Sequence, residues 1–239
     1  MRQVLLSAGA EESQIMAKLQ PIATDMHALG NPWISYSVYL NNSFLPGLLQ
    51  LMILLVTVFS IGSEMKRATS REWLRTADDS IIIAITGKLI PQTIIFFSMG
   101  LLYLSLLYGY LHFPMHNSIW HMIFAMFLLV VASQSFAVII MCFAPSLRIG
   151  LSVGGLVGVL SLSIAGFSFP VPAMYLPFQA ISYVLPVRHY FLIYVDQALN
   201  GIPLYYSRVH YVALILFAVA STPLLPRLKK ALMRQVYVP

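Results

Sequence analysis

Residues 118–143 read SIWHMIFAMFLLVVASQSFAVIIMCF and contain no Lys, Arg, Asp or Glu. A helix needs about 20 predominantly apolar residues to cross the ~30 Å hydrocarbon core of a bilayer. This stretch is both long enough and apolar enough for that. We therefore predict a membrane-spanning helix from about Ser118 to Phe143.

Four further stretches have the same character. They run from about Phe44 to Ile61, Leu89 to Tyr110, Ile149 to Phe169 and Tyr211 to Leu225, the last being the shortest. The whole chain is 59% hydrophobic and 9% charged, against about 45–50% and about 25% in an ordinary soluble domain. We predict an all-α, polytopic integral membrane helix bundle with about five transmembrane helices in a lipid bilayer.

Basic residues lie between the apolar stretches, and this placement predicts the orientation. The net charge of +6 is therefore interpreted as a topology signal and as contacts to lipid headgroups, with no nucleic acid as a partner. One side of the predicted membrane holds Lys66, Arg67, Arg71, Arg75, Lys88, Arg148, Arg227, Lys229, Lys230 and Arg234. The other side holds Arg2, Lys18, Arg188 and Arg208. Since cytoplasmic segments are enriched in Lys and Arg, we expect the N-terminus of this chain outside and its C-terminus in the cytoplasm.

Residues 63–80, SEMKRATSREWLRTADDS, form the most strongly charged stretch. At 3.6 residues per turn, Met65, Ala68, Trp73 and Leu74 supply an interrupted apolar face. The pattern predicts a short amphipathic helix that lies along the cytoplasmic surface of the membrane.

Residues 170–210 connect the last two predicted spans on the outer side and are rich in Pro, Tyr and Phe. We expect two short helices that dip into the outer interface, a re-entrant hairpin broken by Pro177, Pro186 and Gly201. The alternative is a sixth, tilted span from about Met174 to Leu199. That span would place Arg188, His189 and Asp196 within the bilayer at considerable cost.

These features together resemble the permeases of type-2 ABC exporters, the ABC-2 membrane family. The family carries a glutamate-rich basic motif after its second helix, which EMKRATSREWL at residues 64–74 resembles, with Ala68 at the glycine position. GKLIPQ at 87–92 is similar to the start of the family's third helix. FPVPAMYLPFQAISYVLPVRHYF at 169–191 is similar to its outer hairpin. The resemblance covers most of the chain from Leu29 onward.

The resemblance implies six helices with a large external domain after the first. Residues 1–43 would then be the C-terminal remnant of that external, periplasmic domain, and residues 44–239 the ABC-2 transmembrane domain. The alternative for residues 1–43 is a simple translocated leader. This interpretation expects a chain truncated at its N-terminus. It also implies a bacterial inner-membrane location, a dimer of permease subunits and a separate ATP-binding cassette ATPase subunit.

The charged segment would be the element that couples the permease to this ATPase. The candidate coupling residues are Glu64, Lys66, Arg67, Thr69, Arg71, Glu72, Trp73 and Leu74. Charged side chains orient a docking surface, and Trp73 would fill a pocket of the partner. The alternative is a solvated interfacial helix with Trp73 in the aromatic belt.

Glycines and polar residues inside the spans are the other candidates. The glycines Gly150, Gly154, Gly155 and Gly158 form small-xxx-small frames for helix packing, either within one chain or between subunits. Ser133, Gln134 and Ser135 lie in a span and are candidates either for a substrate path or for interhelical hydrogen bonds.

Catalysis is not expected of this chain. It has no GxxxxGK[ST] phosphate-binding loop, so ATP hydrolysis would belong to a partner. Cys142 is the single cysteine, and the spacing of His112, His116 and His121 does not suit a helical metal site, so we expect no metal and no cofactor. The expected function is export, with a hydrophobic or amphipathic compound preferred. A non-catalytic membrane scaffold or an unrecognised intramembrane enzyme is the alternative.

Overall fold

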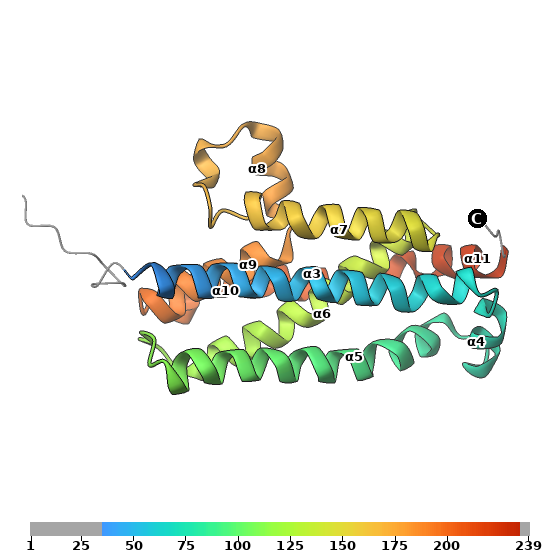
Figure 1. The fold of residues 1–239 in the computed structure, drawn as a ribbon, viewed down its shortest axis with the longest axis horizontal. Helices are drawn as coiled ribbons and strands as arrows, with labels where there is room; N and C mark the ends of the chain where they lie inside the picture. The colour runs from blue at the N-terminus through green and yellow to red at the C-terminus, as the bar shows by residue number, and fades with distance from the viewer. Residues whose placement is uncertain (1–34, 235–239) are drawn as a thin grey trace, which may run out of the picture. The chain divides into compact units, whose positions relative to one another are not determined.

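The computed structural model describes residues 35–234, and within this range the secondary structure is entirely helical (Figure 1). The long helices are α3 (Tyr36–Lys66), α5 (Ile81–Leu104), α6 (Ile119–Phe143), α7 (Leu147–Ile164) and α10 (Leu204–Val219). The shorter α-helices are α4 (Ser70–Thr76), α8 (Leu176–Tyr183), α9 (Pro186–Tyr194) and α11 (Leu225–Arg234). Two π-helical turns, η1 (Ser105–Tyr110) and η3 (Val195–Leu199), and two 3₁₀ turns, η2 (Val171–Ala173) and η4 (Thr222–Leu224), complete the described part.

The prediction of an all-α protein with five spans is confirmed. In the described residues, five helical stretches are long and apolar enough to cross a bilayer, and each contains or overlaps one predicted span. They are Tyr36–Lys66, Ile81–Tyr110, Ile119–Phe143, Leu147–Ile164 and Leu204–Arg234.

The first helix begins well before the predicted start at Phe44. Polar side chains are tolerated there because they bond to the helix itself: Asn42 Nδ2 donates to the Val38 carbonyl at 2.9 Å, and Ser43 Oγ donates to the Tyr39 carbonyl at 2.7 Å. Residues 36–43 are therefore helical, whereas residues 1–34 lie outside the described range. The assignment of residues 1–43 to an external domain stays a prediction.

The second helix also begins earlier, at Ile81, so Lys88 lies inside it. Hydropathy alone excluded this residue from the span. The structure accommodates the charge because Lys88 Nζ donates to the Ser60 carbonyl at 2.7 Å and meets a carboxylate of α3. A partnered charge near the end of a span costs far less than an isolated one.

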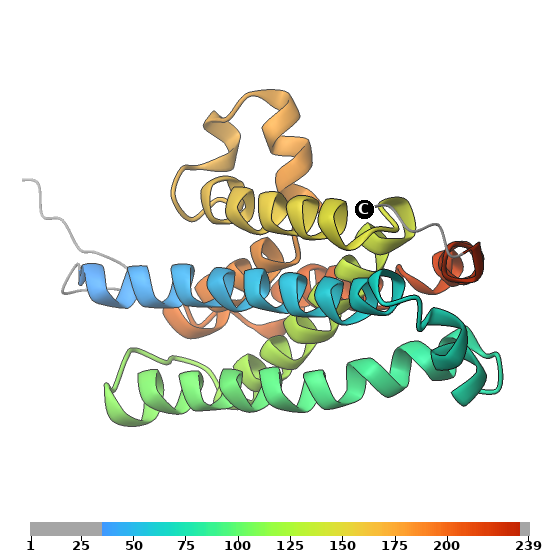
Figure 2. The same cartoon turned by 45° about the vertical axis from the view of Figure 1, so that its right-hand side comes forward.

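Helix α6 lies at the centre of the bundle. Its most apolar window is 67% buried, against 44% for α3 and 22% for each of the other three spans. Figures 1 and 2 show α6 crossing behind α3 at a steep angle, and α6 also packs on α5, α9 and α10. A helix that is apolar on all sides suits this position.

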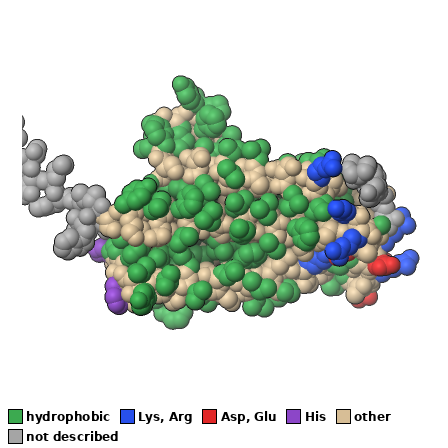
Figure 3. Space-filling model, viewed as in Figure 1, with side chains coloured by type: hydrophobic (Ala, Val, Ile, Leu, Met, Phe, Trp, Pro, Cys, Tyr) green, Lys and Arg blue, Asp and Glu red, His purple; other side chains and the backbone are tan. Residues whose placement is uncertain are grey.

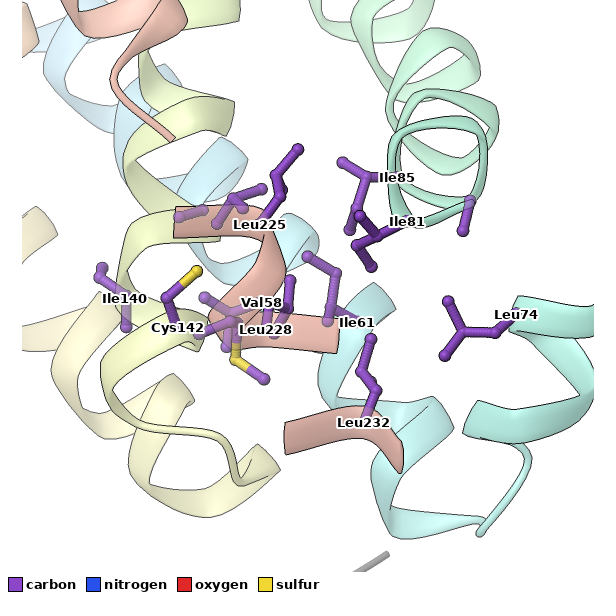
Figure 4. Close-up of a cluster of buried hydrophobic side chains, with 14 of the residues drawn as sticks. Val58, Ile61, Leu74, Ile81, Ile85, Ile140, Cys142, Leu225, Leu228 and Leu232 are labelled. Atoms are coloured by element: carbon purple, nitrogen blue, oxygen red, sulfur yellow. The ribbon is translucent and has the colours of Figure 1, made fainter. Parts of the chain in front are cut away.

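Two large clusters of buried side chains, and a small one of Ile53, Phe96 and Val130, hold the helices together. One cluster joins α3, α4, α5, α6 and α11 at the end of the bundle where α4 and α11 lie (Figure 4). Its labelled members are Val58, Ile61, Leu74, Ile81, Ile85, Ile140, Cys142, Leu225, Leu228 and Leu232. The second cluster joins α5, α6, α9 and α10 through residues that include Met126, Tyr190, Tyr194 and Leu214.

The segment between α7 and α10 forms two short helices, α8 and α9, as predicted. Pro177 lies in the first turn of α8 and Pro186 begins α9, so both prolines start helices where their missing N–H groups cost nothing. The break between the two helices rules out one continuous tilted span. Helix α9 is buried in the bundle, whereas α8 projects from it with Tyr175 and Leu176 about 80% exposed (Figures 1 and 2).

Candidate functional site at the charged end of the bundle

Charged side chains gather at the end of the bundle formed by α4, α11 and the neighbouring ends of the long helices (Figure 3). The remainder of the face shown in Figure 3 is covered mainly by hydrophobic side chains. All eight candidate coupling residues lie at this end, with Glu64 and Lys66 in the last turn of α3 and the other six in the connection between α3 and α5.

Glu64 anchors the turn that follows α3. Its Oε1 lies 2.6 Å from Lys88 Nζ, and its carboxylate accepts a hydrogen bond from the Thr69 hydroxyl. The Thr69 backbone N–H donates to the Glu64 carbonyl at 3.0 Å. Glu64 therefore ties the turn to α5 and to its own helix, so it acts within the chain rather than on an exposed surface.

Ala68 lies at the point where the chain reverses, with φ at +59°. This left-handed conformation is easy for glycine and costs about 1–2 kcal/mol for a residue with a Cβ. The position is the one at which the resembled motif carries glycine. The local backbone explains why glycine suits it.

Trp73 and Leu74 fasten α4 to the bundle. Leu74 is fully buried in the cluster of Figure 4, to which Leu228 and Leu232 of α11 also belong. Trp73 is half-buried against the same cluster, and Lys88 Nζ lies 4.4 Å from the centre of its ring. In this structure both side chains pack inside the chain.

The remaining candidates point outward. Lys66, Arg67, Arg71 and Glu72 are exposed, as is the neighbouring Arg75. Arg71 Nη2 also donates to the Met233 carbonyl at 3.3 Å, which joins α4 to α11. The eight predicted residues thus divide into four that secure the segment and four that are presented on it.

Helix α11 is a part of this end that sequence reasoning treated only as a basic tail. Leu225, Leu228 and Leu232 recur at helical spacing and are buried, whereas Lys230 and Arg234 are exposed. That spacing was the signal for an amphipathic helix. Lys229 Nζ donates to the Asp79 carbonyl at 2.5 Å and closes the contact with the α4 connection. We call the exposed residues Lys66, Arg67, Arg71, Glu72, Arg75, Lys230 and Arg234 the charged-end surface.

The glycines of α7 lie along α3. A Cβ placed on Gly158 would lie 2.3 Å from Leu51 Cδ1, and one on Gly150 would lie 2.9 Å from Val58 Cγ1. Gly154 also faces Val58, at an ordinary 3.6 Å, and the nearest atom to a Cβ on Gly155 lies 3.8 Å away. Gly150 and Gly158 therefore allow α3 and α7 of one chain to approach closely.

The three polar residues of α6 are buried and hydrogen-bonded. Ser133 Oγ donates to the Leu129 carbonyl of its own helix at 2.6 Å. Gln134 Oε1 accepts from Thr93 Oγ1 of α5 at 2.8 Å. Ser135 Oγ accepts from the Ser221 N–H, after α10, at 3.2 Å. Gln134 and Ser135 therefore link α6 to other parts of the bundle, whereas Ser133 bonds only within α6.

Comparison with known proteins gives one family. The family model described as ABC-2 family transporter protein matches residues 1–225, most of the chain. The chain belongs to the ABC-2 transporter family. No curated protein and no solved structure matches it.

Family membership confirms the resemblance found in the sequence. This ABC-2 permease is a multi-pass membrane protein and a transporter subunit rather than a catalytic enzyme. Permeases of the family generally work with an ATP-binding subunit in a membrane complex. The charged-end surface is the part of this permease whose exposed charges suit a water-soluble partner, since the spans expose apolar side chains.

Proposed function

We propose that this permease is the membrane-spanning subunit of an ATP-driven exporter and that its charged-end surface docks onto a separate ATP-binding cassette subunit. One observation carries the proposal. The short helix α4 presents exposed charges outward and is fixed to three spans. The Glu64 turn joins it to α3, the contact of Trp73 with Lys88 joins it to α5, and Leu74 packs in the cluster shared with α11 at the end of the last span.

This attachment provides a mechanical route. A displacement of α4 by a partner moves the ends of α3, α5 and the last span together, because buried side chains and a partly buried ion pair resist their separation. Coupling of this kind requires two defined arrangements of the bundle, between which the partner selects. ATP hydrolysis takes place on the cassette subunit in this proposal.

The charge of the surface indicates the chemistry of the partner. Six of its seven residues are basic and Glu72 is acidic, and the adjacent Asp78 and Asp79 are exposed as well. A complementary docking groove is therefore mainly acidic, with basic groups opposite Glu72 and these two aspartates. Rim charges of this kind steer association and weaken with salt. The same excess of basic residues favours a cytoplasmic position for this end, with the start of α3 outside.

The rest of the arrangement follows the family pattern. We infer a bacterial inner-membrane complex with two permease subunits and two cassettes. In this complex the apolar α8 of each permease lies in the outer interface as part of a re-entrant hairpin. Low charge along the spans favours a hydrophobic or amphipathic cargo.

Co-purification from native membranes tests the docking surface. The test variant is the double change Arg67→Glu/Arg75→Glu, which reverses two exposed charges. The matched control is Arg208→Glu, which reverses an exposed charge outside the charged end. We expect a cassette ATPase to co-purify with the wild type and with the control, and its yield to fall at least tenfold with the double variant.

Two results would contradict the proposal. Absence of any cassette ATPase from the wild-type complex would favour a membrane scaffold. Equal losses with the double variant and with Arg208→Glu would place the contact elsewhere. Trp73→Ala is a poor probe of docking, because its ring packs within the chain and its removal disturbs α4 itself.

A further inference from the structure

Tyrosine hydroxyls converge on Asn42 of α3, far from the charged-end surface. Tyr103 donates to Asn42 Oδ1 at 3.3 Å, and Tyr108 donates to the same oxygen at 2.9 Å. Asn42 is 2% exposed, and its amide nitrogen is used by its own helix. Tyr190 and Tyr194 of α9 lie close enough to interact electrostatically with these phenols. We call Asn42, Tyr103, Tyr108, Tyr190 and Tyr194 the tyrosine cluster.

Tyr190 and Tyr194 each have a buried hydroxyl without a hydrogen-bond partner, although both side chains are only 1% exposed. The Tyr194 hydroxyl lies near the Asn42 side chain without reaching hydrogen-bond geometry. Burial raises the pKa of both phenols, so each keeps a proton to donate. A buried hydroxyl without a hydrogen-bond partner costs free energy, and such hydroxyls are rare in native structures.

Two π-helical turns flank the cluster. Tyr108 belongs to η1, and Tyr194 directly precedes η3. A π turn contains an extra residue and redirects the side chains around it, and such turns occur frequently at functional sites. Their presence on both sides of the cluster indicates that its geometry is specified rather than incidental.

An apolar groove of about 440 Å³ runs between α3 and α5 and reaches Tyr103. Its lining includes Leu49 and Met52 of α3, Met99, Leu102 and Tyr103 of α5, and Leu106 of η1. Met52, Met99 and Leu102 are each at least half exposed, so the groove opens sideways toward the bilayer. Its volume is within the range of small-molecule sites, and methionine side chains adapt to occupants of different shapes.

Tyr103 connects the two features, since its ring lines the groove while its hydroxyl reaches Asn42. Tyr103 therefore belongs to both the groove and the tyrosine cluster. The groove and the cluster contain no Lys, Arg, Asp or Glu. A charged group would be costly there, whereas neutral oxygen acceptors complement the two donors.

We propose that the groove and the tyrosine cluster together bind an uncharged amphiphile, whose hydrocarbon chain lies in the groove and whose polar head accepts hydrogen bonds from Tyr190 and Tyr194. The ligand enters from the bilayer at the half of the bundle opposite the charged end. Binding at this site requires no ATP and no cassette subunit, so it stands apart from the proposed coupling.

Photolabelling of the full chain in phosphatidylcholine vesicles tests this site. The probe is a monoacylglycerol with a diazirine in its acyl chain, and the comparison probe is the lysophosphatidic acid with the same chain. We expect the neutral probe to label peptides of α3 and α5 around Met52 and Met99 at least fivefold more than the anionic probe. The double change Tyr190→Phe/Tyr194→Phe should remove this difference, because it deletes the two donors and keeps the rings.

The control is Tyr110→Phe, since Tyr110 belongs to η1 and is 77% exposed; its labelling should equal that of the wild type. Leu102→Trp fills the groove from a position that is 72% exposed, so the fold tolerates it, and it should reduce labelling by the neutral probe. Equal labelling by the two probes in the wild type would overturn the proposal and leave a groove merely filled by lipid chains. Labelling that the double Phe change does not reduce would overturn it as well.

Discussion

Glu64 of α3 and Lys88 of α5 form an ion pair in which Oε1 and Nζ lie 2.6 Å apart and the two side chains are 24% and 20% exposed. Lys88 also donates to the Ser60 carbonyl and lies over the Trp73 ring. One lysine therefore holds together the end of α3, the start of α5 and α4. This relationship makes the connection between two spans rigid at the place where a partner is proposed to act.

Lys88→Met tests this ion pair. It leaves a partly buried carboxylate without its cation, so we expect the free energy of unfolding to fall by about 1–3 kcal/mol. SDS titration in mixed micelles measures it. The double variant Glu64→Gln/Lys88→Met should lose less than the sum of the single losses. Exposed Lys66→Met is the control, within about 0.5 kcal/mol of wild type. Additive losses would show that the pair contributes nothing.

Ala68→Gly is expected to stabilise the protein, because Ala68 has φ at +59°. Relief of the left-handed strain outweighs the greater freedom of glycine in the unfolded chain, and we expect a gain of about 0.5–1 kcal/mol. Ala231→Gly within α11 is the matched control and should destabilise by roughly the same amount. A loss of stability in Ala68→Gly, measured by thermal unfolding in micelles, would contradict the assigned turn.

Gly158→Ala and Gly155→Ala form a matched pair on α7. The new Cβ at 158 would meet the Leu51 side chain at 2.3 Å and its Cα at 3.2 Å, so α7 must move away from α3, at a cost of about 1–3 kcal/mol. At 155 the nearest atom is 3.8 Å away, and the better helix propensity of alanine should leave stability equal or slightly higher. Equal thermal midpoints for the two variants would refute this close helix contact.

His189 should make stability depend on pH. Burial lowers its pKa, Arg188 and His210 lower it further, and the Tyr183 carbonyl, which lies 3.0 Å from Nε2, opposes them. The unfolded chain, with a histidine pKa of about 6.5, therefore takes up the proton first on acidification. Stability should be fully present above that value and decrease as the pH falls toward the lower folded-state pKa.

The measurement is the difference in thermal midpoint between pH 7.5 and pH 5.5. His189→Gln keeps a donor for the Tyr183 carbonyl and should reduce the pH dependence. His112→Gln, at an exposed position, should leave it unchanged. The same pH dependence in wild type and His189→Gln would assign it to another group, of which His210 and its neighbour Asp196 are the nearest.

Much of the charged end could be predicted from particular residues. The strongly charged connection at residues 63–80 and the lack of charge in the neighbouring spans located the segment correctly between two spans. The division of its residues into buried and exposed ones could not be predicted, because Trp73 and Leu74 pack into a cluster that α3, α5 and α11 build together, and α11 lies far along the chain. Helix α11 itself had a readable signal in the spacing of Leu225, Leu228 and Leu232.

Helix boundaries show the same limit. Hydropathy placed the start of α5 after Lys88, because a charged residue interrupts an apolar stretch when its interaction partners are not known. The ion pair with Glu64 removes that penalty and lets the helix begin at Ile81. The polar side chain of Asn42 is likewise accommodated inside α3, because its amide nitrogen bonds to its own helix and its oxygen accepts from Tyr103 and Tyr108.

The sequence by itself determined that this protein lies in a membrane and how many spans it has, because the length and apolarity of each segment measure its preference for lipid. The positions of its charged residues and its motifs determined the charge difference between its ends and its family. Tertiary structure alone decided which polar groups meet. Gln50 accepts from the Val187 N–H, and Tyr108 donates to Asn42, over separations of 137 and 66 residues. Such pairs depend on how the helices cross and turn about their axes, which no local pattern records.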